Sequence, residues 1–144
     1  MAQGLFLQSR HEVSKRLAVL EDDERVAYLY LTKPGTQQPE KDAIAYSRIK
    51  PIDRVEWEVI KKTGGTPMLL KELASETAVV EKPVEREFSF KWSRDGNAVA
   101  LLRNGVPIAF ASAAEKFGYS KAVAKASPLA NAWDQVKYES LFLK

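Results

Sequence analysis

The 144-residue sequence contains no cysteine and a single histidine, His11. Without cysteine the chain cannot form disulfides, use a catalytic thiolate or bind zinc through sulfur. A metal centre with two imidazole ligands is excluded within one subunit, and any Ser–His–Asp triad would have to use His11. His11 falls in the first turn of an expected surface helix, where a solvated side chain is the simpler interpretation. We expect no metal and no cofactor.

Long apolar runs are absent as well. No segment approaches the ~18 apolar residues of a membrane-spanning helix, and residues 1–7 lack the basic and apolar regions of a signal peptide. We therefore expect a cytoplasmic protein with no membrane partner. The excess of one charge is small, because 22 basic residues face 19 acidic ones and leave a net charge of +3. This balance permits nucleic-acid binding without favouring it.

What the chain does contain is an ordinary globular composition, with 45% hydrophobic and 28% charged residues. A chain of this length can bury a hydrophobic core. We find no repeat, low-complexity segment or linker that would divide it. The expectation is therefore a single globular domain over residues 1–144.

The strongest structural pattern lies in residues 86–112. The turn dipeptides Asp95-Gly96 and Asn104-Gly105 each separate two alternating apolar runs. Such dipeptides favour two-residue hairpin turns, because both central residues of the turn need positive φ. We predict an antiparallel meander with strands near residues 86–94, 97–103 and 106–112.

Counting outwards from the two turns assigns the faces of this meander. Large apolar side chains fall on one face, in the rows Trp92–Val99–Phe110 and Phe90–Leu101–Ile108. A one-residue slip would invert both faces, so the agreement of the rows supports this register. We expect the large-residue face to be the core. The opposite face is rich in alanine: Ala98, Ala100, Ala109 and Ala111. This face should be solvated or covered by a helix or a partner subunit.

The remaining chain supplies two strands and several short helices. The strands are predicted near residues 25–32 and 43–49, with a polar loop between them. Ser9 and Glu12 have the spacing of a capping box, and Val13, Leu17 and Leu20 follow on one helical face. Shorter helices are predicted near residues 52–62, 66–73 and 113–117 and from Asn131 onward, with strand as the alternative for parts of these segments. The expected fold is α+β, a five-stranded antiparallel sheet with an N-terminal helix and one to three further short helices.

The segment Leu101–Ile108 is similar to the strand–Arg-Gly–strand signature of the second Sm motif. It departs from that signature by placing Asn104 between the arginine and the glycine, and the spaced Asp and Asn of the first Sm motif are not present in order. The resemblance implies that the sheet curls into a partly open small barrel of the SH3 or Sm type. It also implies an RNA-binding ring with Arg103 near the nucleotide pocket.

Five residues are candidates for partner or nucleic-acid binding: Arg103, Lys116, Tyr119, Lys121 and Lys125. Basic groups beside a stacking ring are typical of single-strand binding, although a solvated strand face explains the lysines equally well. The deduced register places Arg103 on the large apolar face at the end of a hairpin. There it either reaches water past the sheet edge or pairs with an anion at the rim of a pocket.

We interpret the chain as a small non-enzymatic binding or interaction module that self-associates, because the alanine-rich face and spare aromatic residues suit contact with another protein chain. The expected partner is a second copy or another protein. A small-barrel nucleic-acid binder is the first alternative. A carboxylate-dependent enzyme is the second, since two acids suffice for acid–base catalysis, but no acid has an apolar setting that would raise its pKa.

Overall fold

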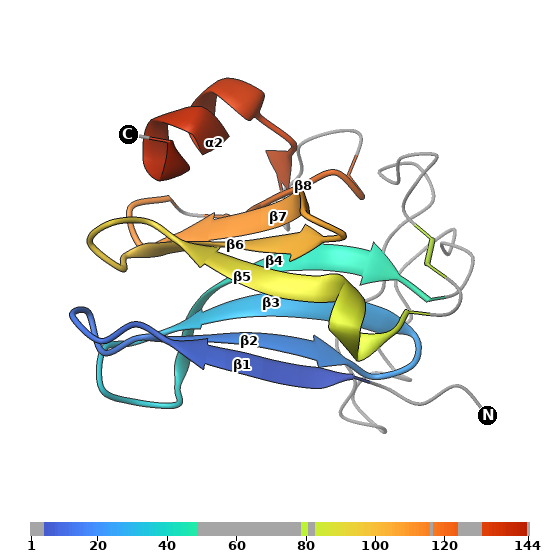
Figure 1. The fold of residues 1–144 in the computed structure, drawn as a ribbon, viewed down its shortest axis with the longest axis horizontal. Helices are drawn as coiled ribbons and strands as arrows, with labels where there is room; N and C mark the ends of the chain where they lie inside the picture. The colour runs from blue at the N-terminus through green and yellow to red at the C-terminus, as the bar shows by residue number, and fades with distance from the viewer. Residues whose placement is uncertain (1–4, 49–78, 81–82, 116, 124–130, 144) are drawn as a thin grey trace, which may run out of the picture.

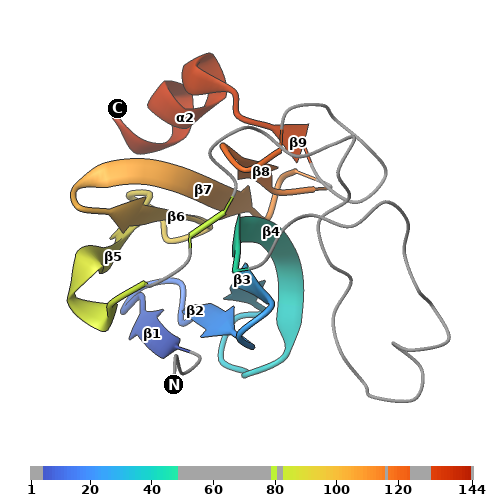
Figure 2. The same cartoon turned by 90° about the vertical axis from the view of Figure 1, so that its right-hand side faces the viewer.

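In the computed structural model the described residues are 5–48, 79–80, 83–115, 117–123 and 131–143. Their strands form two sheets that stack face to face (Figure 1). Turned by 90°, the molecule shows the two curved sheets one above the other, with a helix above the upper sheet (Figure 2). None of the helices in the described part of the chain is long and apolar enough to cross a membrane.

The four-stranded sheet, sheet 1, is an antiparallel meander with the strand order β1-β2-β3-β4. Its strands are β1 (Phe6–Arg10), β2 (Leu17–Asp22), β3 (Val26–Thr32) and β4 (Pro39–Ser47). In β3 the alternation of side chains is plain, because Leu29 and Leu31 are fully buried whereas Tyr28 and Tyr30 remain partly exposed on the other face.

The five-stranded sheet, sheet 2, has the order β5-β6-β7-β8-β9. Its strands are β5 (Phe88–Trp92), β6 (Ala98–Arg103), β7 (Val106–Ser112), β8 (Tyr119–Ser120) and β9 (Asn131–Ala132). The pairs from β5 to β8 are antiparallel, and β8 and β9 are parallel. The 3₁₀ helix η1 (Glu85–Glu87) precedes β5, and α2 (Gln135–Phe142) follows β9.

The main core lies between the two sheets. Sheet 1 contributes Leu20, Leu29 and Leu31, which are fully buried, and sheet 2 contributes Val99 and Leu101. Burial of these apolar side chains is the main favourable contribution to the free energy of folding. The sheets also meet along one side, where the backbone N–H of Gly118 donates to the carbonyl of Asp42 at 3.0 Å.

A second apolar cluster lies on the outer face of sheet 2, under α2. Phe110 is fully buried there, and its ring centroid is 4.7 Å from that of Tyr119 and 5.8 Å from that of Phe142. Ala98 and Ala100 belong to the same cluster. Their small side chains let α2 approach the sheet closely, so a helix of the same chain covers this alanine-containing face.

The α+β prediction with one five-stranded sheet, or a small barrel, is wrong. The strands predicted near 25–32, 43–49, 86–94, 97–103 and 106–112 exist as β3 to β7 with changed ends. They are divided between two sheets, because residues 6–22 add two strands to β3 and β4. Sheet 1 therefore separates from the C-terminal meander as a layer of its own.

The predicted N-terminal helix is replaced by the β1–β2 hairpin. The turn closes with hydrogen bonds between His11 and Arg16 and between Lys15 and His11, and Lys15 adopts φ 65°. Burial in β2 has a period of two, with Ala18 and Leu20 inward. Val13, expected on the apolar stripe of the helix, is 78% exposed. The hairpin is stabilised because its inward side chains pack against sheet 2, and this tertiary packing outweighs the local helix-capping pattern.

The further predicted helices also fail or fall outside the described residues. The segments 52–62 and 66–73 lie outside, and residues 113–115 form a turn. Asn131 does not start a helix but belongs to β9; Asp134 instead caps α2, and its carboxylate accepts from the backbone N–H of Lys137 at 3.0 Å. In the described part of the chain, α2 is the only α-helix.

The predicted register is right between β5 and β6. Between β6 and β7 it is right beside the turn, where Arg103 pairs with Val106 and Leu102 with Pro107, and wrong beyond Leu102. Trp92 pairs with Val99 and Phe90 with Leu101, as expected. A bulge after Leu101 then shifts β7, so that Leu101 faces Ala109 and not Ile108. Pro107, opposite Leu102, has no N–H for the ladder, and proline within sheets is confined to edges and bulges. The shift turns Phe110 to the α2 side and places Ala109 and Ala111 in the main core.

Candidate binding pocket

Two hairpin turns meet at one end of the sandwich, the β1–β2 turn (residues 11–16) and the β5–β6 turn (residues 93–97). Gly96 has φ 75°, and a Cβ placed on it would lie 2.3 Å from Nδ1 of His11 and 2.5 Å from Oγ of Ser14. The His11 ring packs on Trp92 with the centroids 5.4 Å apart. Only glycine allows the two turns to approach this closely.

Arg16 joins the two sheets at the same end. Its Nε donates to Oδ1 of Asn97 at 2.9 Å, across the gap to sheet 2. Its Nη1 donates to the carbonyl of Thr32 at 2.9 Å and to Oε1 of Glu40 at 3.2 Å. The side chain is 9% exposed, so its charge is compensated by Glu40 while most of its surface is out of water.

The β5–β6 turn is held by the carboxylate of Asp95. The backbone N–H of Asn97 donates to this carboxylate at 2.9 Å, and the hydroxyl of Ser93 donates to it at 2.8 Å. The first of these bonds, followed by the second, lowers the pKa of Asp95 below its ordinary value. Asp95 is therefore a fixed negative charge near neutral pH and a weak proton acceptor.

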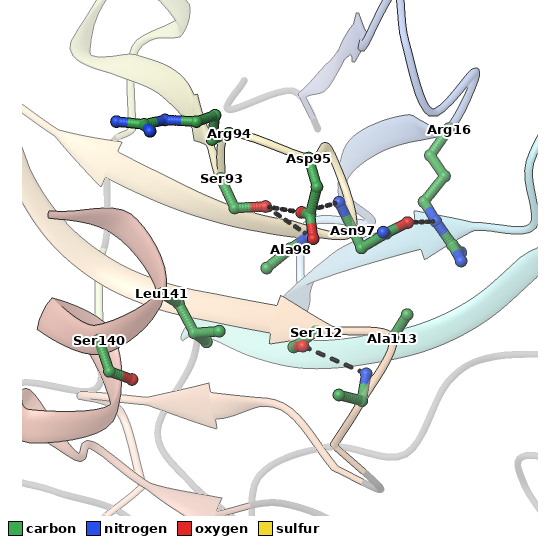
Figure 3. A pocket seen from close by; sticks show the side chains of 11 residues that line it. Arg16, Ser93, Arg94, Asp95, Asn97, Ala98, Ser112, Ala113, Ser140 and Leu141 are labelled. Atoms are coloured by element: carbon green, nitrogen blue, oxygen red, sulfur yellow. Dashed lines mark hydrogen bonds between the residues drawn. The ribbon is translucent and has the colours of Figure 1, made fainter. Parts of the chain in front are cut away.

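A pocket of about 770 Å³ opens beside this turn (Figure 3). Its walls come from the β5–β6 turn, the end of β7 and the residues just after it, the last turn of α2, and Arg16. Figure 3 shows Arg16 and Arg94 on opposite sides of Asp95. The apolar part of the lining consists of Ala98, Ala113, Ala114 and Leu141. The volume lies within the range of small-molecule sites.

The chemistry of the pocket suits binding more than catalysis. Asp95 is the one acid that lines it in the described part of the chain, so a pair of carboxylates is missing there. His11 is absent from the lining, and its Nδ1 accepts the backbone N–H groups of Val13 and Ser14 at 3.2 Å each. Among the described residues, no group of acids and imidazoles is arranged to hold a metal ion.

The sequence-predicted site residues that the structure describes, Arg103, Tyr119 and Lys121, are absent from the lining of this pocket. Lys116 and Lys125 are outside the described residues. Tyr119 stacks on Phe110 and donates its hydroxyl to Glu115 at 3.3 Å, and the ammonium of Lys121 lies 4.7 Å from the Trp133 ring centroid. These two side chains belong to the outer, α2-covered face of sheet 2.

Arg103 lies on the other face of sheet 2, in the row of Phe88 and at the far end from the pocket. Its Nη2 pairs with Oε2 of Glu87 at 3.2 Å. A backbone hydrogen bond from Val84, followed by the Arg103 charge, lowers the pKa of Glu87. The structure thus gives Arg103 a partner from its own chain, and it does not bring Arg103 together with Tyr119 and Lys121.

A buried ionic cluster at that far end was not foreseen. Nη1 of Arg48 pairs with Oδ2 of Asp22 at 2.8 Å, and the Tyr46 hydroxyl donates to the same oxygen at 2.6 Å. The side chains of Arg48 and Asp22 are 4% and 0% exposed. In the sequence Asp22 is one of four consecutive acids, so nothing distinguishes it as the buried one.

Comparisons with protein-family models, with curated proteins and with solved structures found no match for this chain.

Proposed function

We propose that this protein is a non-enzymatic binding module that holds a short acidic peptide segment of a partner protein in the end pocket. The observation that carries the proposal is the lining of the pocket. Arg16 and Arg94 lie on opposite sides of a single acid, Asp95, and Ala98, Ala113, Ala114 and Leu141 form the apolar part of the wall. An acidic side chain of the segment would pair with a guanidinium, and its small apolar side chains would contact Ala113 and Leu141.

The rigidity of the walls supports this assignment. Arg16 is held by three hydrogen bonds and the β5–β6 turn by the bonds to Asp95. A pre-formed site loses little conformational entropy when a ligand binds, which is one source of affinity. The enzymatic alternative receives less support, because a low-pKa acid without a partner acid is a poor general base.

The test uses panning of a phage-displayed random peptide library on the folded protein. Ala114 lines the pocket and is exposed, so Ala114→Trp should fill the pocket without entering the core. The matched control is Val136→Trp, because Val136 is 78% exposed on α2 and absent from the pocket lining. We expect enriched peptides to be acidic and to bind Ala114→Trp at least about tenfold more weakly than Val136→Trp.

Either of two results would reject the proposal. The first is a library that yields no peptide distinguishing the two variants. The second is enrichment of basic peptides, since the guanidinium groups would repel them. The nucleic-acid alternative is tested on the same protein by titration with single-stranded RNA at two salt concentrations, since such binding weakens steeply as salt rises.

Self-association is part of the same interpretation but needs a different surface. The alanine-containing face of sheet 2 that motivated it packs under α2. The surface that we assign to self-association is the edge of sheet 1.

A further inference from the structure

Strand β1 is an edge of sheet 1 whose outward backbone groups can be identified. The N–H of Asp22 donates to the carbonyl of Leu5, and the N–H of His11 donates to the carbonyl of Arg16. In an antiparallel ladder the hydrogen-bonded pairs alternate, so residues 5, 7, 9 and 11 point their backbone groups at β2. The N–H and C=O groups of Phe6, Gln8 and Arg10 therefore point away from the sheet.

The β1 edge lacks the features that usually prevent an edge strand from pairing with another chain. In the described part of the chain β2 is the only strand that pairs with β1. The five residues of β1 contain no proline, and their pairing with β2 has no bulge. The inward side chains, Leu7 and Ser9, carry no charge. Edge strands of soluble proteins are normally blocked by proline, bulges or inward-facing charges.

The side chains of the same three residues form an exposed row. Phe6, Gln8 and Arg10 are all exposed, and Phe6 is 61% exposed although it is a large apolar residue. They lie on the outer face of sheet 1, where Phe6 is next to Glu21 and Gln8 is next to Val19. The row has an aromatic ring at one end, an amide in the middle and a guanidinium at the other end.

We propose that a second copy of this chain pairs its β1 with β1 in antiparallel orientation, about a two-fold axis at Gln8. Gln8 then faces Gln8 of the partner subunit as a hydrogen-bonded pair, and Phe6 faces Arg10 of the partner subunit. All the outward backbone groups of the row find partners, and the two copies of sheet 1 become one continuous sheet. A self-complementary patch of this kind closes after two subunits.

Charge favours this orientation. Each Arg10 lies over the Phe6 ring of the other copy, which is a cation–π contact. It also moves toward the acidic part of that face, because Glu21 lies beside Phe6 and Asp42 beside Tyr30. Burial, followed by Glu21, Asp42 and Asp23, raises the pKa of Tyr30 to about 12. A parallel pairing would instead put like residues side by side, with Arg10 against Arg10 of the partner subunit.

The test exploits the absence of cysteine. In a hydrogen-bonded pair the two Cα atoms are about 5.5 Å apart, which suits a disulfide. A Gln8→Cys variant should therefore form a covalent dimer under mild oxidation. The matched control is Gln38→Cys, because Gln38 is also exposed but lies in the β3–β4 turn, outside the β1 edge that pairs in the proposed dimer. We expect the dimer to form at least about tenfold faster for Gln8→Cys than for Gln38→Cys, by the effective concentration that pairing creates.

Light scattering after size exclusion measures the reversible dimer. Edge pairing buries little area, so we expect a weak dimer that dissociates over a dilution from about 1 mM to about 1 µM. Gln8→Pro removes an outward N–H that β2 does not use, and Phe6→Lys places a positive charge opposite Arg10. Both should be monomeric over that range, while Gln8→Ala, which keeps the backbone N–H, should still dimerise.

Two results overturn the inference. One is a wild-type monomer at about 1 mM together with equal cross-linking of Gln8→Cys and Gln38→Cys. The other is a dimer that persists in both Gln8→Pro and Phe6→Lys, because a different surface would then be responsible. Circular dichroism of each variant establishes that it is folded, and Phe6→Lys keeps the inference testable where Gln8→Pro does not fold. The end pocket is not involved, so failure here leaves the peptide-binding proposal standing.

Discussion

The indole N–H of Trp92 donates to the Ser9 hydroxyl at 3.0 Å, and this bond links the edge strands of the two sheets. The same indole packs on His11, and His11 lies against Gly96. Residues more than 80 positions apart in the sequence thus fix how one sheet sits on the other.

Gly96→Ala should destabilise the protein by about 3 kcal/mol, because the new Cβ meets the His11 ring and the residue keeps positive φ. Gly35→Ala is the matched control, since Gly35 has φ 72° with nothing within 4 Å of a new Cβ. It should cost only the backbone penalty of about 1 kcal/mol. Urea unfolding measures both, and equal losses would contradict the close approach of the two turns.

Phe110→Ala should lower the free energy of unfolding by about 4 kcal/mol, because the Phe110 ring is fully buried in the cluster under α2. Ile108→Ala should cost clearly less, about 1 to 2 kcal/mol, since Ile108 is only partly buried. Thermal or urea unfolding gives the comparison. Large and comparable losses in the two variants would favour the register without a bulge, in which Ile108 and Phe110 both face the main core.

Asp22→Asn should destabilise the protein by about 3 kcal/mol, because it removes the carboxylate that faces buried Arg48 and accepts the Tyr46 hydroxyl. Asp23→Asn is the control one residue away. Its ion pair with Arg25 spans 3.7 Å and is partly exposed, so the loss should stay below about 1 kcal/mol. Similar losses in the two variants would show that the Asp22–Arg48 pair contributes no more than a surface pair.

Asp95→Asn should be destabilising in a pH-dependent way. Folding lowers the pKa of Asp95, so its charge contributes stability above the unfolded pKa of about 3.9 and loses that contribution as pH falls through the folded pKa. The difference in stability between wild type and Asp95→Asn should therefore be present at neutral pH and shrink below about pH 4. Unfolding curves at several pH values measure it, and a difference that grows on acidification would have the wrong sign.

The parts of the fold that follow from local chemistry could be predicted from the sequence. At Asn104-Gly105 both residues adopt positive φ, as predicted, whereas at Asp95-Gly96 only the glycine does. The predicted register between β5 and β6 is still the one observed. The bulge beside Pro107 depends on how β7 pairs with β6 and β8. A local sequence pattern does not contain this information. Residues 9–20 match a helix and a hairpin equally, and only contacts with Trp92 and Gly96 decide between them.

The candidate site was beyond prediction for the same reason. Arg16 and Asn97 are ordinary polar residues in two separate turns, and their importance comes from facing each other across the gap between the sheets. Arg103 was singled out by its place on an apolar face, yet Glu87, the residue immediately before β5, compensates its charge. The positions of Lys116 and Lys125 stay untested.

The order of the strands has a consequence for how this chain acquires its structure. Sheet 1 is built from consecutive strands within residues 6–47, and the strands from β5 to β8 are also consecutive neighbours. Each layer can therefore assemble from short loop closures, which favours fast folding. The contacts that join distant parts of the chain, from Arg16 to Asn97 and from Ser9 to Trp92, form only when the two layers dock. During synthesis, sheet 1 is complete in sequence before the strands of sheet 2 have left the ribosome. The apolar face of sheet 1 therefore stays exposed until sheet 2 packs on it.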